Sequence, residues 1–259
     1  MALLADAGHN FSDVLALGLS WGASRLSQRP PSARFTYGLK GSSILAALAN
    51  AALLWVALGA ILVESIRHLI EPAPAGGAAM MIVAAVGIAV NGFSALLFAG
   101  KSDLNVRAAF QHMLADALVS AGVVVAGGLV LLSGFAWIDP VASLVITVVI
   151  GMGSWSLLRE SVLLGLDAVP AGIDEAAVQT YLAGQPGVCA VHDLHIWPMS
   201  TTETALTAHL VIPAGHPGDA FLHTLADRLA ADFGIGHATV QIEIDEHAHD
   251  CALVSEAVV

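Results

Sequence analysis

The sequence has few charged residues and especially few basic ones. Only 12% of its 259 residues are charged, and 9 lysine and arginine residues stand against 21 aspartate and glutamate residues. A soluble domain carries about twice that share of charge. The shortage of basic residues excludes a nucleic-acid-binding surface, which needs positive charge. Together with a hydrophobic fraction of 57%, it indicates a protein that resides in a lipid bilayer.

The chain also lacks the residue patterns of several enzyme classes. It contains no His-Glu-x-x-His sequence, which argues against a zinc protease, and no pair of Glu-x-x-His sequences of the kind that di-iron bundles use. The sequence also shows no Ser/His pattern of the kind that an intramembrane hydrolase needs. Two cysteines, Cys189 and Cys251, are too few for a disulfide framework and favour a reduced, intracellular C-terminal part. We therefore expect that the protein is not an enzyme.

Long apolar stretches fill the first 159 residues. Each is close to the length needed to cross the ~30 Å hydrocarbon core of a bilayer. We expect spans at about 3–24, 41–63, 78–100, 108–133 and 141–158. Residues 1–159 are therefore predicted to form an α-helical, polytopic transmembrane domain.

Lysine and arginine residues near the span ends predict the orientation of this domain. The loops 25–40 and 101–107, with Arg159, hold seven of these residues, whereas the loops on the opposite side hold only Arg67. Because basic residues accumulate on the cytoplasmic side, the C-terminal part is expected in the cytoplasm. Five spans then place Met1 outside. Either the chain inserts in that orientation or a preceding span is missing. We favour a missing span of roughly 20 apolar residues before Met1, which would return the N-terminus to the cytoplasm.

Residues 160–259 differ sharply from the rest, with 14 acidic residues, one basic residue and eight histidines. Hydrophobic periodicity predicts an α+β domain with three strands and helices on one face of the sheet. In the last strand, Ala238, Val240, Ile242 and Ile244 are expected to point inward and Glu243 outward. The expected elements are a helix at 174–183 capped by Asp174, strands at 188–197 and 205–212, a helix at 221–233 ended by Gly234, and a strand at 237–245.

Two His-x-x-x-Asp sequences lie inside expected spans. They are His9 with Asp13, and His112 with Asp116. On a helix, residues four apart lie on the same face, so each pair presents an imidazole and a carboxylate together. Two such helices would supply the four ligands of a tetrahedral divalent cation such as Zn²⁺. The alternative is that the pairs are buried polar contacts that hold helices together, as we expect for Asn50 and Asn91.

The C-terminal domain offers a second group of ligand candidates. His209 and Glu243 fall on outward strand faces. His192 shares its phase with Leu194 and Ile196, so periodicity buries His192 and exposes His195, although the start of this strand is ambiguous. The terminal segment 246–251, which includes Cys251, is either a ligand cluster or a frayed tail.

Several segments together resemble the cation diffusion facilitator family. They are Leu4-Ala5-Asp6-Ala7-Gly8-His9-Asn10-Phe11-Ser12-Asp13, the basic loop into Tyr37-Gly38, His112-Met113-Leu114-Ala115-Asp116, and Val191-His192-Asp193-Leu194-His195-Ile196-Trp197. The resemblance covers nearly the whole chain. It implies six transmembrane helices, of which the first is not in this sequence, and a cytoplasmic ferredoxin-like domain, in a homodimer.

The resemblance also implies residue roles. The family's transport site corresponds to His9, Asp13, His112 and Asp116. Its cytoplasmic ligands correspond to His192, His209 and Glu243, with Cys251 or a nearby histidine as completion. The resemblance thus favours His192 over His195. The loop 34–43 has no histidine, so the extra ion of some family members is not expected there.

These patterns lead to a functional expectation. We expect efflux of a divalent metal, most favourably Zn²⁺ with Cd²⁺, Co²⁺ or Ni²⁺ as alternatives, across the inner membrane in exchange for protons. Protons compete with metal for carboxylate and imidazole ligands, which couples the two fluxes. The alternative is a membrane protein that senses or buffers metal without transporting it.

Overall fold

The computed structural model describes residues 18–19, 21–23, 25–71, 77–98 and 104–244. These residues fall into two compact units. One consists mainly of Ala49–Leu158, and the other combines Ser20–Leu48 with the chain from Arg159 onward. The second unit is therefore built from two segments that are far apart in the sequence.

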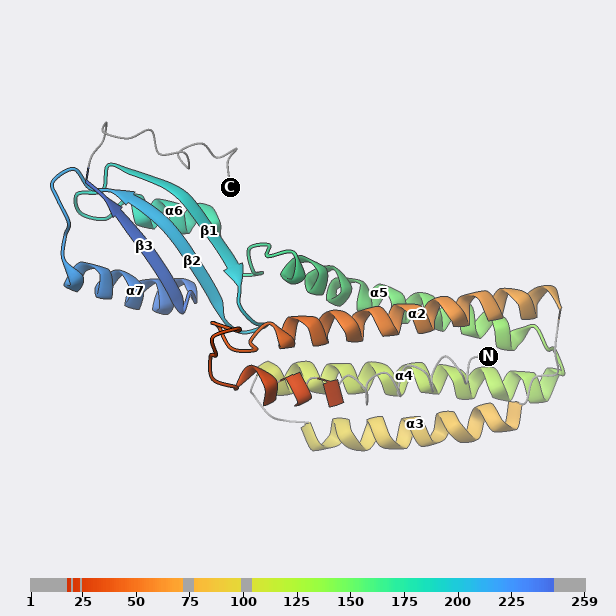
Figure 1. Ribbon diagram of the computed structural model, residues 1–259. Helices are drawn as coiled ribbons and strands as arrows, with labels where there is room; N and C mark the ends of the chain where they lie inside the picture. The colour runs from red at the N-terminus through yellow and green to blue at the C-terminus, as the bar shows by residue number, and fades with distance from the viewer. Residues whose placement is uncertain (1–17, 20, 24, 72–76, 99–103, 245–259) are drawn as a thin grey trace. The chain divides into compact units, whose positions relative to one another are not determined.

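Four long helices carry the apolar part of the chain (Figure 1): α2 (Ser42–Ile70), α3 (Gly77–Phe98), α4 (Leu104–Ser133) and α5 (Ile138–Gly165). The turn between α4 and α5 follows from its residues. Gly134 takes the left-handed conformation, at φ +69°, and its N–H binds the carbonyl of Val130. Pro140 sits in the first turn of α5, where the missing N–H costs nothing.

These helices agree with the expected spans wherever the structure describes them. Among the described residues, Ser42–Ile70, Asp116–Ser133 and Ile138–Gly165 are long and apolar enough to cross a membrane, and α3 contains the shorter apolar stretch Met81–Phe93. They overlap the stretches where spans are expected, at 41–63, 108–133, 141–158 and 78–100, although α2 and α5 extend several residues beyond the expected bounds. The span expected at 3–24 lies mostly outside the described residues.

The helical unit is apolar on its outside as well as inside. Its interior is a small cluster from α2, α3, α4 and α5: Leu54, Leu58, Ala84, Val123, Ala126, Ile146 and Ile150. Large apolar side chains also cover the surface, with Leu132 89% exposed and Met152 76% exposed. A surface of this kind is stable only against lipid or another apolar surface.

The second unit contains a three-stranded sheet with two helices: α6 (Glu175–Ala183), β1 (Ala190–Pro198), β2 (Thr204–Val211), α7 (Asp219–Phe233) and β3 (His237–Glu243). The strand order is β1-β2-β3, with β1 and β2 antiparallel and β2 and β3 parallel. Helix α7 makes the crossover that a parallel pair requires. The predicted α+β architecture is confirmed.

Local sequence signals at the helix ends are also confirmed. The Asp174 carboxylate accepts hydrogen bonds from the N–H groups of Ala176 and Ala177, at 3.1 and 3.4 Å, and caps α6. Gly234 ends α7 in the left-handed conformation, with φ +71°. Each signal is short-range chemistry, so it can be recognised without knowledge of the tertiary fold.

Both helices pack on the same face of the sheet. Leu206, Leu210 and Ile196 of the strands form one core with side chains of α6 and α7, namely Val178, Leu182, Leu225 and Leu229. The expected inward residues Ala238, Val240 and Ile242 pack against this core. The expectation for Ile244 is wrong, because β3 ends at Glu243 and Ile244 is 57% exposed. Alternation ceases to predict orientation once the ladder pairing ends.

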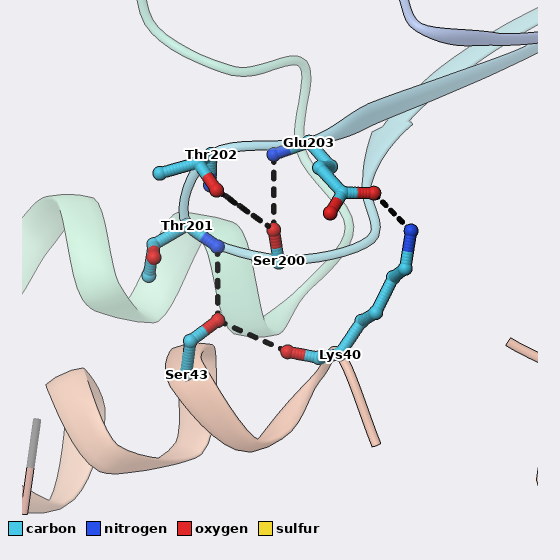
Figure 2. A network of polar contacts seen from close by, with 6 residues as sticks. All are labelled: Lys40, Ser43, Ser200, Thr201, Thr202 and Glu203. Carbon is cyan, nitrogen blue, oxygen red and sulfur yellow. Dashed lines mark hydrogen bonds and ion pairs between the residues drawn. The ribbon is translucent and has the colours of Figure 1, made fainter. Parts of the chain in front are cut away.

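The end of the basic segment and the first turn of α2 contact the turn between β1 and β2 (Figure 2). The Oγ of Ser200 accepts hydrogen bonds from the N–H groups of Thr202 and Glu203, which closes the turn. The Thr201 N–H then binds Ser43 Oγ at 3.1 Å, and Lys40 forms an ion pair with Glu203. These contacts explain why residues 20–48 belong to the same unit as the sheet.

Candidate metal sites

The structure describes one side chain of the expected transport site. Asp116 lies on α4 and is 6% exposed. His112 lies one turn earlier on the same helix, but its side chain is outside the described part, and His9 and Asp13 are outside it entirely. The four-ligand arrangement therefore stays a prediction.

The setting of Asp116 is unusual for a carboxylate. It is the only charged residue between Asp116 and Ser133, a stretch apolar enough to cross a bilayer. Ser120, one turn further along α4, is fully buried and extends the same polar strip. Ionisable groups at this depth are costly to bury, and they generally mark ion pathways.

In the second unit, three expected ligands come together from three different strands. They are His192 on β1, His209 on β2 and Glu243 at the end of β3, and one ligand atom of each lies within 4.8 Å of the others. The Glu243 carboxylate joins the two imidazoles, because Oε2 lies 3.0 Å from His192 Nε2 and Oε1 lies 2.9 Å from His209 Nδ1. The two rings meet edge to face, with centroids 4.9 Å apart.

A β-bulge explains how His192 reaches this group. In the ladder His192 faces His209 and His195 faces Thr207, so β1 has one more residue than β2 between these pairs. The extra residue reverses the phase of the strand. Ile196 therefore points into the core while His192 lies on the opposite face. Periodicity alone, which places His192 with Leu194 and Ile196, is wrong for this reason.

The electrostatics of Glu243 suit a cation. Burial by itself raises the pKa of this carboxyl, but the hydrogen bond with His192 and the charges of His192 and His209 outweigh burial and hold the pKa below its ordinary value of 4.5. Glu243 is therefore an anion at neutral pH. A carboxylate and two imidazoles are a suitable donor set for Zn²⁺ and similar ions.

The two imidazoles also carry polar atoms without partners. Among the described residues, the buried Nδ1 atoms of His192 and His209 make no hydrogen bond. The Nδ1 atom of His209 makes no hydrogen bond although it lies only 2.9 Å from Glu243 Oε1. An N–H on this nitrogen would therefore not point at the carboxylate oxygen. Buried nitrogens of this kind are costly unless they bind something, and a metal ion fits that requirement.

Sequence reasoning missed one residue beside this group. Asp193 Oδ1 lies 2.9 Å from His195 Nε2, and Asp193 Oδ2 lies 3.4 Å from His209 Nε2. The only signal in the sequence is that Asp193 directly follows a candidate ligand. The expected ligand Cys251 and the segment 246–251 lie outside the described residues.

Two family models match the chain. The first, described as the cation efflux transmembrane domain, matches residues 1–164. The second, described as the cytoplasmic domain of cation efflux proteins, matches residues 170–245. The two matches follow one another along the chain in the order that the composition indicates.

Curated proteins similar to this chain are metal transporters by name. Zinc transporter ZitB of Escherichia coli is 34% identical over 98% of this chain and 82% of its own length. A cadmium, cobalt and zinc/H(+)-K(+) antiporter of Bacillus subtilis is 30% identical, over 99% of this chain and 84% of its own length. Metal cation efflux system protein CzcD of Cupriavidus metallidurans is 34% identical over 94% of this chain and 78% of its own length. None of these names describes an enzyme, in agreement with the expectation from the sequence.

A solved structure, the metal-bound C-terminal domain of the CzcD transporter from Cupriavidus metallidurans, is also similar. It is 39% identical, covers 27% of this chain and 99% of that domain, and has a TM-score of 0.26. The family matches and the relatives agree with the resemblance seen in the sequence. The chain belongs to the cation diffusion facilitator family of cation efflux transporters.

Proposed function

We propose that this protein exports a divalent metal, most favourably Zn²⁺, from the cytoplasm in exchange for protons, through a site formed by His9, Asp13, His112 and Asp116. The observation that carries the proposal is Asp116, a carboxylate that is 6% exposed within an apolar α4. His112 precedes it by four residues on the same helix. The relatives' names supply zinc, cadmium and cobalt as the candidate cargo.

The chemistry of these ligands couples metal to protons. Two carboxylates offset the charge of a divalent cation, and two neutral imidazoles complete four ligands. Each ligand must be free of its proton to bind metal, so loading releases protons and unloading takes them up. Alternate exposure of such a site to the two sides of the membrane would exchange metal for protons.

We further propose that His192, His209 and Glu243 hold a second, regulatory metal ion in the cytoplasm, with a residue of the segment 246–251, such as Cys251, completing the site. Two observations support this second site. The three ligand atoms lie within 4.8 Å of one another, and the buried Nδ1 atoms of His192 and His209 make no hydrogen bond. The C-terminal domain is proposed to join two copies in a homodimer, as in the family that the sequence resembles. Metal bound there changes transport only if its affinity differs between conformations.

The test is metal flux in sealed vesicles. The purified chain is reconstituted with a pH-sensitive dye inside, and Zn²⁺ is added outside. We expect zinc entry accompanied by proton movement in the opposite direction, and no proton movement with Mg²⁺, a harder cation that prefers oxygen ligands. Zinc binding without any flux would refute transport and support a sensing or buffering function instead.

A double variant tests the division of labour between the two sites. We expect that His209→Ala with Glu243→Ala lowers the number of zinc ions bound per chain, measured by calorimetry on the full chain. Slow transport should remain. A matched double variant, His216→Ala with Glu175→Ala, changes the same residue types outside the group and should alter neither quantity. Unchanged zinc binding in the first variant would refute the cytoplasmic site, and complete loss of transport would refute its regulatory role.

A further inference from the structure

We propose that Asp193 is a positioning residue for the cytoplasmic metal site: it holds the His209 imidazole with its proton on Nε2, so that the Nδ1 lone pair faces Glu243. The role of the site itself rests on the proposed function. The orientation of His209 does not, because it is a property of the metal-free protein.

The geometry of His209 separates its two nitrogens. Nε2 lies 3.4 Å from Asp193 Oδ2, and Nδ1 lies 2.9 Å from Glu243 Oε1. In a neutral imidazole one nitrogen donates and the other accepts. Nδ1 makes no hydrogen bond among the described residues although Glu243 is close, so an N–H on Nδ1 would not reach its acceptor. A proton on Nε2 instead lies beside the Asp193 carboxylate, in an ion-pair contact of 3.4 Å, which leaves Nδ1 as the ligand atom.

This arrangement follows a general pattern of metal sites. A histidine ligand commonly donates its second N–H to a carboxylate, which fixes the ring orientation and makes the ligand nitrogen more basic. In this chain the carboxylate would be Asp193 and the ligand atom Nδ1 of His209. The side chains of Asp193 and His209 are each only 12% exposed, so water competes weakly for the contact.

The backbone places Asp193 for this contact. Its φ of +51° is in the left-handed region, which few residues other than glycine, asparagine and aspartate adopt. The residue forms the bulge between His192 and His195. In a regular strand Asp193 would point to the face opposite His192, toward the core. The bulge instead turns its carboxylate onto the face of the ligands.

His195 holds the other oxygen of the same carboxylate. Its Nε2 lies 2.9 Å from Asp193 Oδ1, whereas its side chain is 41% exposed and does not belong to the group of His192, His209 and Glu243. Both oxygens of Asp193 therefore face an imidazole. His195 thereby steadies the carboxylate without joining the three-residue group. Its removal should have a smaller effect than removal of Asp193.

The test uses variants that tolerate a positive φ. Asp193→Gly removes the carboxylate and keeps the bulge, and Asp193→Asn keeps a neutral acceptor of the same shape. Asp227→Asn, on the exposed face of α7, is the control. The full chain, labelled with ¹⁵N-histidine, is studied metal-free by solid-state NMR, with the His209 signal assigned from His209→Gln.

We expect the proton of His209 on Nε2 in the wild type and in Asp227→Asn, and a mixture of both tautomers in Asp193→Gly.

Zn²⁺ affinity is then measured against a chelator in the Asp116→Ala background, which weakens the proposed transport site. We expect a loss of about 10–100-fold for Asp193→Gly and a smaller loss for Asp193→Asn. A wild-type proton on Nδ1, or an unchanged tautomer in Asp193→Gly, would overturn the positioning role. A third outcome separates the two proposals. If the tautomer changes as expected but His209→Gln does not lower zinc binding, the positioning role is supported and the proposed metal site is refuted.

Discussion

The two units of this protein both have apolar cores, but they differ in the polar and apolar side chains around those cores. In the helical unit, Leu132 and Met152 are exposed while Asp116 and Ser120 are buried. In the sheet-containing unit, Leu206 and Leu210 are buried, and the polar ligand candidates lie on the opposite face of the sheet. The two surfaces match two solvents, lipid for the first and water for the second.

This difference changes what a candidate ligand reveals. In the apolar helical unit a buried carboxylate such as Asp116 is informative, because an ionisable group is costly to place in an apolar span. In the acidic second unit, carboxylates and histidines are common on the surface, so composition alone does not identify a site. There the geometry decides, since only three described residues bring their ligand atoms within 4.8 Å.

The largest effect is expected for Asp116. Asp116→Ala should abolish metal-driven proton movement in vesicles, because it removes one of two charged ligands from an apolar region. Asp139→Asn is the matched control. Asp139 is also buried, in the first turn of α5, but it does not belong to the proposed site. The control should retain most of the exchange, and normal exchange by Asp116→Ala would remove Asp116 from the transport site.

An intermediate effect concerns stability and tests the two solvents directly. Leu210→Ala empties a fully buried position in β2 and should lower the free energy of opening of the sheet by about 2–5 kcal/mol. Leu132→Ala removes the same atoms from a side chain that is 89% exposed, and should cost about 0.5 kcal/mol or less.

Hydrogen exchange of peptides from β2 and α4 in the full chain measures both changes. The comparison between the units would fail if the two substitutions had equal cost. In that case Leu132 would pack against protein, in a second copy of the chain, rather than against lipid.

The smallest effect is the pH dependence that Glu243 contributes. Because its folded-state pKa lies below 4.5, folding favours the ionised form. This contribution is complete above the unfolded-state pKa of about 4.3 and is lost as the pH falls through the lower folded-state pKa. Metal-free Glu243→Gln should therefore be less stable than the wild type at pH 6, and the gap should narrow below about pH 4.5. A gap that stays constant down to pH 3 would contradict the interaction with His192 and His209.

Much of the architecture could be predicted because its causes are local. The Asp174 cap and the Gly234 stop each depend on residues within one or two turns, and each apolar span is one continuous stretch of the sequence. The alternation in β3 likewise placed Ala238, Val240 and Ile242 correctly. The candidate ligands His209 and Glu243 followed from the same rule, since both lie outside the core on well-paired strands.

Other features depend on contacts between distant segments. The bulge at Asp193 reverses the phase of β1, and no pattern in that strand alone distinguishes it from regular alternation. The pairing of Lys40 and Ser43 with the turn at 200–203 joins residues about 160 positions apart. Neither could be read from hydrophobic periodicity, which reports burial within one element.

The sequence by itself determined which part of the chain meets lipid, the α+β composition of the remainder and the residue types available as ligands. These properties follow from composition, hydrophobic period and capping, which act over a few residues. Only the tertiary structure decided that His192, rather than His195, joins His209 and Glu243, and that Asp193 turns toward His209. Those outcomes depend on strand register, which is settled when three separate strands pair and one of them accommodates an extra residue.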